Sequence, residues 1–301
     1  MKILYFIFII ISALVLIFLF ADIMIGYLNY RNIFQRNGKM RKKFEKIYQQ
    51  DKRELKDFSN AQLINIIVED NTKFEAIYQD NNSSKLVLIV HGYGQDKQSL
   101  HEWSKLFKSI GFDELLIDLY FDGGVVDGKT IQYENNNINL WLDKAKGLKD
   151  YSQIVLMGLG IGGTIVMGIL PQKDNRVKAI ICDSCFDNTL KQVMFLNSKK
   201  KFKSKLFMKI FLNYLIKNKK INLKKLDNCE LLKQSKIPIL ILHGENDKIT
   251  PVEMAYNLYA SLPEKLSQIN VFKNSGHLES IKTNNYLYKN EIKNFLNKYN
   301  I

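Results

Sequence analysis

A glycine turn between an apolar run and a helical segment constrains this chain more than any other feature. Residues 154–157 read Ile-Val-Leu-Met, which has the character of a buried strand. Gly158 and Gly160 follow, and residues 161–170 have the pattern of a helix. A chain that passes this sharply from strand to helix needs backbone angles that glycine adopts freely and other residues resist. The segment therefore predicts a strand, a tight turn centred on Gly160 and a helix.

The same alternation of short apolar runs and amphipathic stretches continues from residue 61 to residue 301. Alternating strands and helices are typical of an α/β fold with a mostly parallel sheet, covered by helices on both faces. We expect strands over residues 63–68, 73–78, 86–90, 115–118, 154–157, 179–182, 239–242 and 266–272. We expect helices over residues 97–110, 133–148, 161–170, 251–262 and 284–299.

Residues that could take part in catalysis follow the predicted strands. They are His91-Gly92-Tyr93-Gly94, the glycine turn at 160, an acid loop with Asp247, and a histidine at 277. In α/β sheets, active residues gather at the carboxyl ends of the strands. Each residue alone has an ordinary explanation, because an aspartate before a helix is usually a cap and a loop histidine is usually solvated. Their order is more specific, since turn, acid and base follow one another as in a Ser–Asp–His triad.

Several motifs resemble those of the α/β-hydrolase superfamily. His-Gly-Tyr-x-x-Asp-Lys occupies residues 91–97, His-Gly-x-x-Asp-x-x-x-Pro occupies 243–251, and Gly-His-x-Glu-Ser occupies 276–280. The resemblance extends from about residue 60 to the C-terminus and is closest to membrane-anchored bacterial hydrolases. It implies the α/β-hydrolase fold and a small acyl or ester-type ligand, with no cofactor and no metal.

The resemblance also assigns roles to individual residues. Asp247 would orient His277, and His277 would act as the general base. The backbone N–H groups of Tyr93 and Ile161 would form the oxyanion hole. Gly160 stands where the motif Gly-x-Ser-x-Gly has its nucleophilic serine. A second departure lies at residues 118–124, where the family's Asp-x-Arg-Gly-His-Gly-x-Ser loop is replaced by another sequence.

The glycine at the nucleophile position predicts little or no catalysis. A non-glycine residue in such a turn costs about 1–3 kcal/mol of backbone strain, which is tolerated where the hydroxyl is needed. Gly160 is therefore expected where catalytic demand has lapsed, and a designed serine-to-glycine change would give the same sequence. Thr164, Ser184 and Cys185 are not expected to replace the nucleophile, but water activated by His277 is a further possibility.

The N-terminal segment predicts a membrane anchor. Residues 3–20 are apolar except for Ser12 and would span about 27 Å as a helix, close to the thickness of a bilayer core. We expect a single-pass cell-membrane anchor over residues 1–28 and a basic helical stalk over 29–60; a cleaved signal peptide is the alternative. Basic residues are more frequent after this segment than before it, which favours a cytoplasmic globular domain.

An insertion at residues 184–236 interrupts the alternation. Between Thr189 and Leu226 there are 12 lysines and no acidic residue. Apolar residues recur at helical spacing, at positions 202, 206, 207, 210, 211, 214 and 215. We expect a lysine-rich helical cap whose apolar side packs over the site. A basic amphipathic helix resting on anionic lipid is the other interpretation, and both can hold.

Two functions remain open from the sequence. The first is a serine-hydrolase-type enzyme for esters, thioesters or other acyl groups, weakly active or inactive because of Gly160. The second is a pseudoenzyme that binds a ligand, lipid or protein. The net charge of +14 is not accompanied by a nucleic-acid-binding motif, so no nucleic-acid partner is expected. The odd number of cysteines, 3, argues against a disulfide framework.

Overall fold

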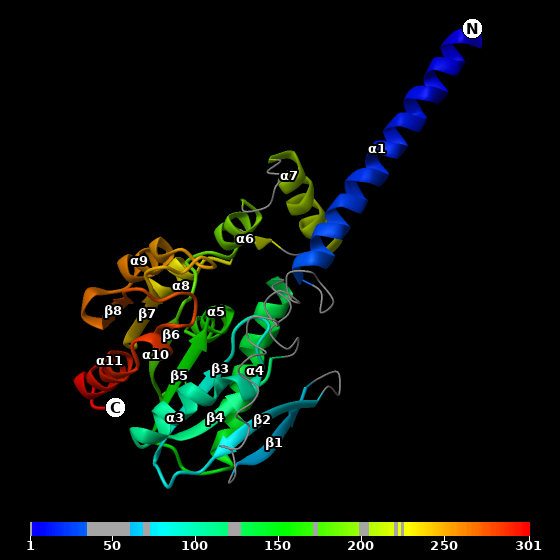
Figure 1. Cartoon of the computed structure of the whole chain (residues 1–301). Coiled ribbons are helices and arrows are strands. Elements are labelled where there is room, and N and C mark those ends of the chain that lie inside the picture. The colour runs from blue at the N-terminus through cyan, green and yellow to red at the C-terminus, as the bar shows by residue number, and fades with distance from the viewer. Residues whose placement is uncertain are drawn as a thin grey trace.

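A computed structural model of the chain describes residues 2–34, 61–68, 73–119, 128–170, 174–198, 205–219, 222–223 and 226–301. Most of the predicted stalk, residues 35–60, and the altered loop at 120–124 lie outside the described residues. Figure 1 shows a sheet covered by helices and an N-terminal helix that projects from the domain beside α7.

The sheet has eight strands in the order β1-β2-β4-β3-β5-β6-β7-β8. Strand β2 is antiparallel to β1 and to β4, and the remaining neighbours are parallel. The mostly parallel sheet is therefore confirmed, and each predicted strand occurs to within two residues of its expected limits. The strands are β1 Gln62–Ile67, β2 Lys73–Gln79, β3 Lys85–Val90, β4 Asp113–Ile117, β5 Gln153–Leu159, β6 Val177–Asp183, β7 Ile239–Gly244 and β8 Ser267–Phe272.

Helices cover both faces of the sheet. The domain's helices are α3 His101–Ser109, α4 Gly128–Lys146, α5 Ile161–Met167, α6 Thr189–Ser198, α7 Lys205–Tyr214, α8 Asn228–Leu232, α9 Val252–Ser261, α10 Ser280–Thr283 and α11 Asn285–Lys298. Shorter turns are η2 Lys97–Leu100, η3 Leu215–Lys219 and η5 Glu264–Leu266. The helix predicted over 161–170 is shorter in the structure: α5 ends at Met167, Gly168 is its C-cap, and residues 168–170 form a turn.

Strand β3 shows why the central strands read as unbroken apolar runs. Leu86, Leu88 and Val90 point into a core with α4, α5 and α9. Val87 and Ile89 point the other way, into a core with α3, α10 and α11. Both faces are buried, so every position favours an apolar residue.

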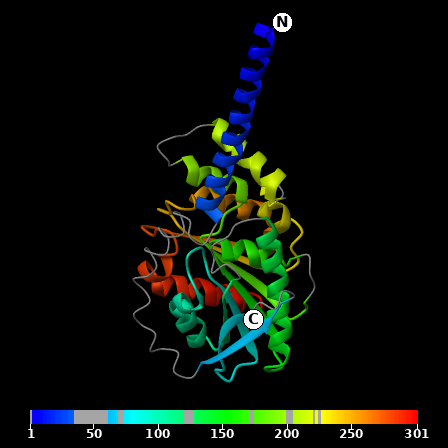
Figure 2. The same cartoon turned by 90° about the vertical axis from the view of Figure 1, so that its right-hand side faces the viewer.

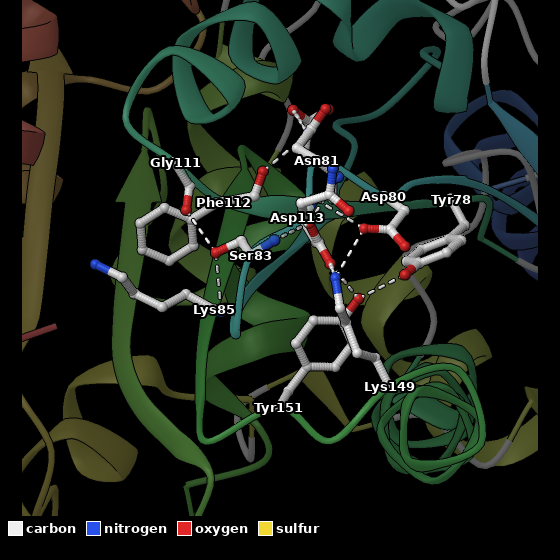
Figure 3. Close-up of polar contacts among 12 residues, drawn as sticks. Tyr78, Asp80, Asn81, Ser83, Lys85, Gly111, Phe112, Asp113, Lys149 and Tyr151 are labelled. Atoms are coloured by element: carbon white, nitrogen blue, oxygen red, sulfur yellow. Dashed lines mark hydrogen bonds and ion pairs between the residues drawn. The ribbon is translucent and has the colours of Figure 1, made fainter.

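A polar cluster closes the amino-terminal end of β4. The buried carboxylate of Asp113 accepts hydrogen bonds from the Tyr151 hydroxyl at 2.7 Å and from Lys149 Nζ at 3.0 Å. The backbone N–H groups of Asn81 and Ser83 donate to its other oxygen at 2.7 and 3.0 Å. Figure 3 shows these side chains converging on Asp113. A buried charge with four donors is satisfied, so the cluster fastens the turn between β2 and β3.

The N-terminal helix α1, Lys2–Phe34, packs against α7 at its carboxyl-terminal part. Its segment Tyr5–Asn29 has a mean hydropathy of 3.0 and by length and composition meets the requirement for a membrane span, as a signal sequence also would. Figures 1 and 2 show α6 and α7 at the same end of the domain as α1. The described part of the 184–236 insertion contains the helices α6, α7 and α8.

Candidate active site

The turn at Gly160 has the backbone that its sequence predicts. Gly160 lies between β5 and α5 with φ 53° and ψ −114°, and its N–H donates to the Asp183 carbonyl oxygen at 2.8 Å. The flanking glycines are needed for space rather than for their angles. A Cβ at Gly158 would lie 2.3 Å from the Gly163 nitrogen, and a Cβ at Gly162 would lie 2.3 Å from the Val90 carbonyl oxygen. The close packing of α5 against the sheet therefore depends on these two residues.

The structure brings the predicted acid and base together. His277 Nδ1 lies 2.7 Å from Asp247 Oδ2 and donates a hydrogen bond to it. The other carboxylate oxygen accepts the backbone N–H groups of Ile249 and Thr250 at 2.7 and 2.8 Å. Burial alone would raise the pKa of the Asp247 carboxyl, but the charge of His277 and its hydrogen bond outweigh burial and lower that pKa. Asp247 is therefore held as a carboxylate that orients the imidazole.

His277 faces Gly160, the position at which the sequence motif predicts a nucleophile. A Cβ built on Gly160 would lie 3.6 Å from His277 Nε2 and 3.8 Å from Cε1, and no other atom of the described residues, beyond its chain neighbours, lies within 4 Å. A hydroxyl one bond further out would be within hydrogen-bond reach of Nε2. The site thus has room for a serine at residue 160 and holds an imidazole aimed at it.

The two residues predicted to form the oxyanion hole also lie close together. Ile161 opens α5, and the first backbone N–H groups of a helix have no partner within it. The turn containing Tyr93 is held by Gln95, whose side-chain oxygen accepts the Gly92 N–H at 2.8 Å. Tyr93 and Ile161 belong to one apolar cluster, which also contains Phe186, Phe195 and Met254. An apolar surface therefore adjoins the turn at Gly160.

The side chains considered as substitute nucleophiles are buried and engaged elsewhere. Thr164 Oγ1 accepts a hydrogen bond from Asn228 Nδ2 at 3.0 Å. Ser184 Oγ donates to Asp183 Oδ1 at 3.0 Å. Cys185 Sγ donates to the Gly158 carbonyl oxygen at 3.5 Å, and burial raises the pKa of its thiol. These contacts agree with the expectation that none of the three replaces a serine.

His243 supports the acid, a role that the sequence analysis missed. Its Nε2 donates to the Thr250 carbonyl oxygen at 2.9 Å and lies 3.4 Å from Asp247 Oδ2. Burial lowers the pKa of this imidazole, so it remains neutral beside the carboxylate. The signal available was its position at the end of a strand, four residues before Asp247.

Asp183 forms a second missed cluster beneath the turn. Its Oδ2 accepts the Tyr288 hydroxyl at 2.6 Å, and that hydroxyl in turn accepts Trp103 Nε1–H at 3.0 Å. Burial raises the pKa of the Asp183 carboxyl to about 6. Because the carbonyl oxygen of Asp183 accepts the Gly160 N–H, the cluster ties the turn to α3 and α11.

Among the described residues, no group of three or more His, Cys, Asp or Glu side chains is placed to hold a metal ion.

Comparisons with known proteins agree with this architecture. The sequence profile of the prolyl oligopeptidase family matches residues 137–300, more than half of the chain. No protein of curated function matches the chain significantly by sequence.

Among solved structures, an esterase of Pyrococcus furiosus is 20% identical, with 81% of this chain and 93% of that chain covered and a TM-score of 0.63. A putative lipase of Acinetobacter baumannii is 19% identical, with 84% and 96% covered and a TM-score of 0.59. An acylaminoacyl peptidase of Pyrococcus horikoshii is 17% identical, with 80% of this chain and 41% of that chain covered and a TM-score of 0.59. These likenesses show the α/β-hydrolase fold.

Proposed function

Because the chain belongs to the prolyl oligopeptidase family of serine-hydrolase-type proteins, we propose that it is a membrane-anchored protein that binds ester or acyl groups and hydrolyses them only weakly. The observation that carries this proposal is the pairing of His277 with Gly160. The imidazole is oriented by Asp247 and lies 3.6 Å from where a serine Cβ would be, but residue 160 has no side chain.

The retained groups suit one chemical task. The backbone N–H groups of Tyr93 and Ile161 would bind the oxygen of an ester or thioester carbonyl and stabilise the charge that develops on it. The apolar cluster with Phe186 and Met254 would hold the acyl part. Binding in this form needs no nucleophile.

Slow hydrolysis would use water in place of serine. His277 Nε2 would remove one proton from a water molecule while the remaining hydroxide forms a bond to the carbonyl carbon. The tetrahedral intermediate would then collapse, the bond to the leaving group would break, and the proton on Nε2 would pass to the departing oxygen or sulfur. Serine proteases that lack a triad member retain roughly 10³–10⁴-fold catalysis over water, which sets the scale of the expected rate.

A second candidate is a pseudoenzyme that uses the site only for binding. The relaxed backbone at residue 160 favours it, because glycine removes the strain that a serine would impose at φ 53°. Measured turnover separates the two candidates, since binding alone leaves the ester intact.

Replacement of Gly160 by serine tests the proposal. The native protein should hydrolyse p-nitrophenyl esters at or near the rate of buffer and should not react with a fluorophosphonate probe. Gly160→Ser should react with the probe and hydrolyse the esters, and Gly160→Ser with His277→Ala should do neither. Labelling of the native protein would reveal another nucleophile, and a silent Gly160→Ser variant that folds normally would show that the remaining site is not competent.

The membrane anchor and the cytoplasmic side of the globular domain are part of the same proposal. The apolar stretch in α1 supports the anchor, and the basic residues that follow it in sequence support the orientation. Release of the protein from membranes by detergent, but not by high salt or carbonate, is the expected behaviour of a spanning helix.

A further inference from the structure

Helix α1 meets the insertion at a very close crossing. Gly26 is buried, whereas the flanking residues Tyr27 and Leu28 are each 37% exposed. A Cβ on Gly26 would lie 2.5 Å from Tyr214 Cβ and 2.6 Å from its Cγ. The two helices therefore approach more closely than any side chain at residue 26 permits. We call this contact of Gly26 with Tyr214 the seam.

Two apolar clusters on different sides of α6 link α7 to α6 and α6 to the site. Phe211, in the same helix as Tyr214, packs with Val193 of α6 in one buried cluster. Two residues further along α6, on another side of that helix, Phe195 packs against the cluster that contains Ile161, the residue next to Gly160. Helices α6 and α7 thus lie between α1 and the wall of the site, and the contact of α1 with α7 sets how that side of the domain faces the membrane.

The length of α1 places the seam near the membrane surface. If the hydrocarbon core takes residues 3–20, the seam lies six residues beyond Phe20, which is about 9 Å along a helix. The headgroup layer is roughly 5–8 Å thick on each side of the core, so α7 lies at the outer edge of that layer. Lys209 and Lys217 are exposed there, and their positive charges favour an anionic surface.

The apolar residues exposed near the seam fit the same depth. Met194 on α6 is 49% exposed and Ile216 in η3 is 46% exposed. Apolar side chains beside lysines on neighbouring helices suit the boundary between lipid headgroups and water. Figures 1 and 2 show that α6 and α7 share the end of the domain from which α1 projects.

We propose that α6 and α7 hold the mouth of the site against the headgroup layer of an anionic membrane, and that the ester or acyl group it receives belongs to a lipid of that membrane. The substrate class rests on the proposed hydrolase-type site, and the position of α6 and α7 rests on the proposed membrane anchor. A lipid would place its polar carbonyl beside His277 and an apolar chain along Phe186, Phe195 and Met254.

Depth-dependent quenching tests the geometry without any measurement of activity. Full-length protein carrying Cys229→Ser is placed in vesicles of phosphatidylcholine and phosphatidylglycerol with a quencher attached to the headgroups. A fluorophore is attached at Ile216→Cys or, as the matched control, at Tyr286→Cys, a position that is 81% exposed. Tyr286 belongs to α11, and this helix lies away from α1 in both views. Quenching at residue 216 at least about threefold stronger than at 286 supports the proposal; equal quenching, or none at 216, overturns it.

Disruption of the seam tests whether α1 sets this position. Gly26→Leu should reduce the quenching at residue 216 at least about twofold, because a leucine side chain overlaps Tyr214. Ile23→Leu, at a 55% exposed position of the same helix, should leave it unchanged. Unchanged quenching in Gly26→Leu would overturn the role of the seam.

The substrate class is tested separately with Gly160→Ser in the same vesicles. We expect hydrolysis of a short-chain phospholipid ester to fall several-fold in the Gly26→Leu background, with hydrolysis of a soluble p-nitrophenyl ester unchanged. Hydrolysis of the soluble ester alone would overturn the lipid substrate. If neither ester is hydrolysed, the proposed function is contradicted. The quenching experiment would still decide whether α6 and α7 lie at the headgroup layer.

Discussion

The Ser184 hydroxyl accepts a hydrogen bond from the backbone N–H of Leu278 at 3.1 Å, and both residues have left-handed backbone angles, with φ 55° and 57°. Neither residue is a glycine, so both carry backbone strain. Leu278 follows His277 directly, and Ser184 follows the buried Asp183. The bond therefore holds the histidine loop to the end of β6, where strain is compensated by contacts on both sides.

Replacement of Ser184 separates the hydrogen bond from the strain. Ser184→Ala leaves the Leu278 N–H without its partner and should lower the free energy of unfolding by about 1–2 kcal/mol. Ser184→Gly loses the same bond but relieves the left-handed strain, so it should be more stable than the alanine variant by about 1 kcal/mol. Urea unfolding monitored by circular dichroism measures both. Equal stabilities of the two variants would show that the backbone at 184 is not strained.

Glu114 gives the fold a pH dependence near neutrality. Its carboxylate is buried beside Ser104 Oγ and Asn81 Nδ2, and burial raises its pKa to about 7. The unfolded chain ionises near pH 4.5, whereas the folded chain holds the proton until about pH 7. The unfolded state therefore binds fewer protons between these values, and stability falls as the pH rises from about 4.5 to 7.

Glu114→Gln should remove this part of the pH dependence. At pH 8 the variant should be more stable than the native protein by up to about 3 kcal/mol, and at pH 4 the two should be similar. Urea unfolding at both pH values checks this, with Asp143→Asn as the control because Asp143 is exposed in its ion pair with Lys146. If the Glu114→Gln variant lost as much stability between pH 4 and pH 8 as the native protein, the pH dependence could not be assigned to Glu114.

The strands were predictable because each central strand is buried on both faces, so that runs such as Leu86–Val90 are apolar throughout. The acid and the base were predictable because their order along the chain is specific, and the structure places Asp247 and His277 2.7 Å apart. The cluster at Asp183 was not predictable, because its partner Tyr288 lies 105 residues away in sequence and no local sequence pattern indicates the contact. The role of Gly26 was not predictable for the same reason: the need for a residue without a side chain arises only from its contact with Tyr214 of α7, which is distant in sequence.

Alanine substitutions of glycines should separate backbone strain from lack of space. Gly160 and Gly111 have φ of 53° and 83°, and a Cβ on either would meet no atom of the described residues closer than 3.6 Å, so alanine at each should cost about 1–3 kcal/mol through backbone strain alone. Gly158→Ala should cost more, because its Cβ would lie 2.3 Å from the backbone nitrogen of Gly163. Thermal and urea unfolding rank the variants. A cost for Gly160→Ala as large as that for Gly158→Ala would show that the space beside His277 is closed.

The acid can be tested once a nucleophile is supplied. In the Gly160→Ser background, Asp247→Asn should lower the rate constant for ester hydrolysis by roughly 10³–10⁴-fold, because the amide no longer holds the Nδ1–H tautomer of His277 that leaves Nε2 free as a base. The control is Asp113→Asn, which removes a buried carboxylate at the opposite end of the parallel strands and should lower stability while the turnover of the folded protein is unchanged. Ester hydrolysis in Gly160→Ser/Asp247→Asn equal to that of Gly160→Ser would mean that the 2.7 Å contact between Asp247 and His277 is structural and that the base is oriented by other groups.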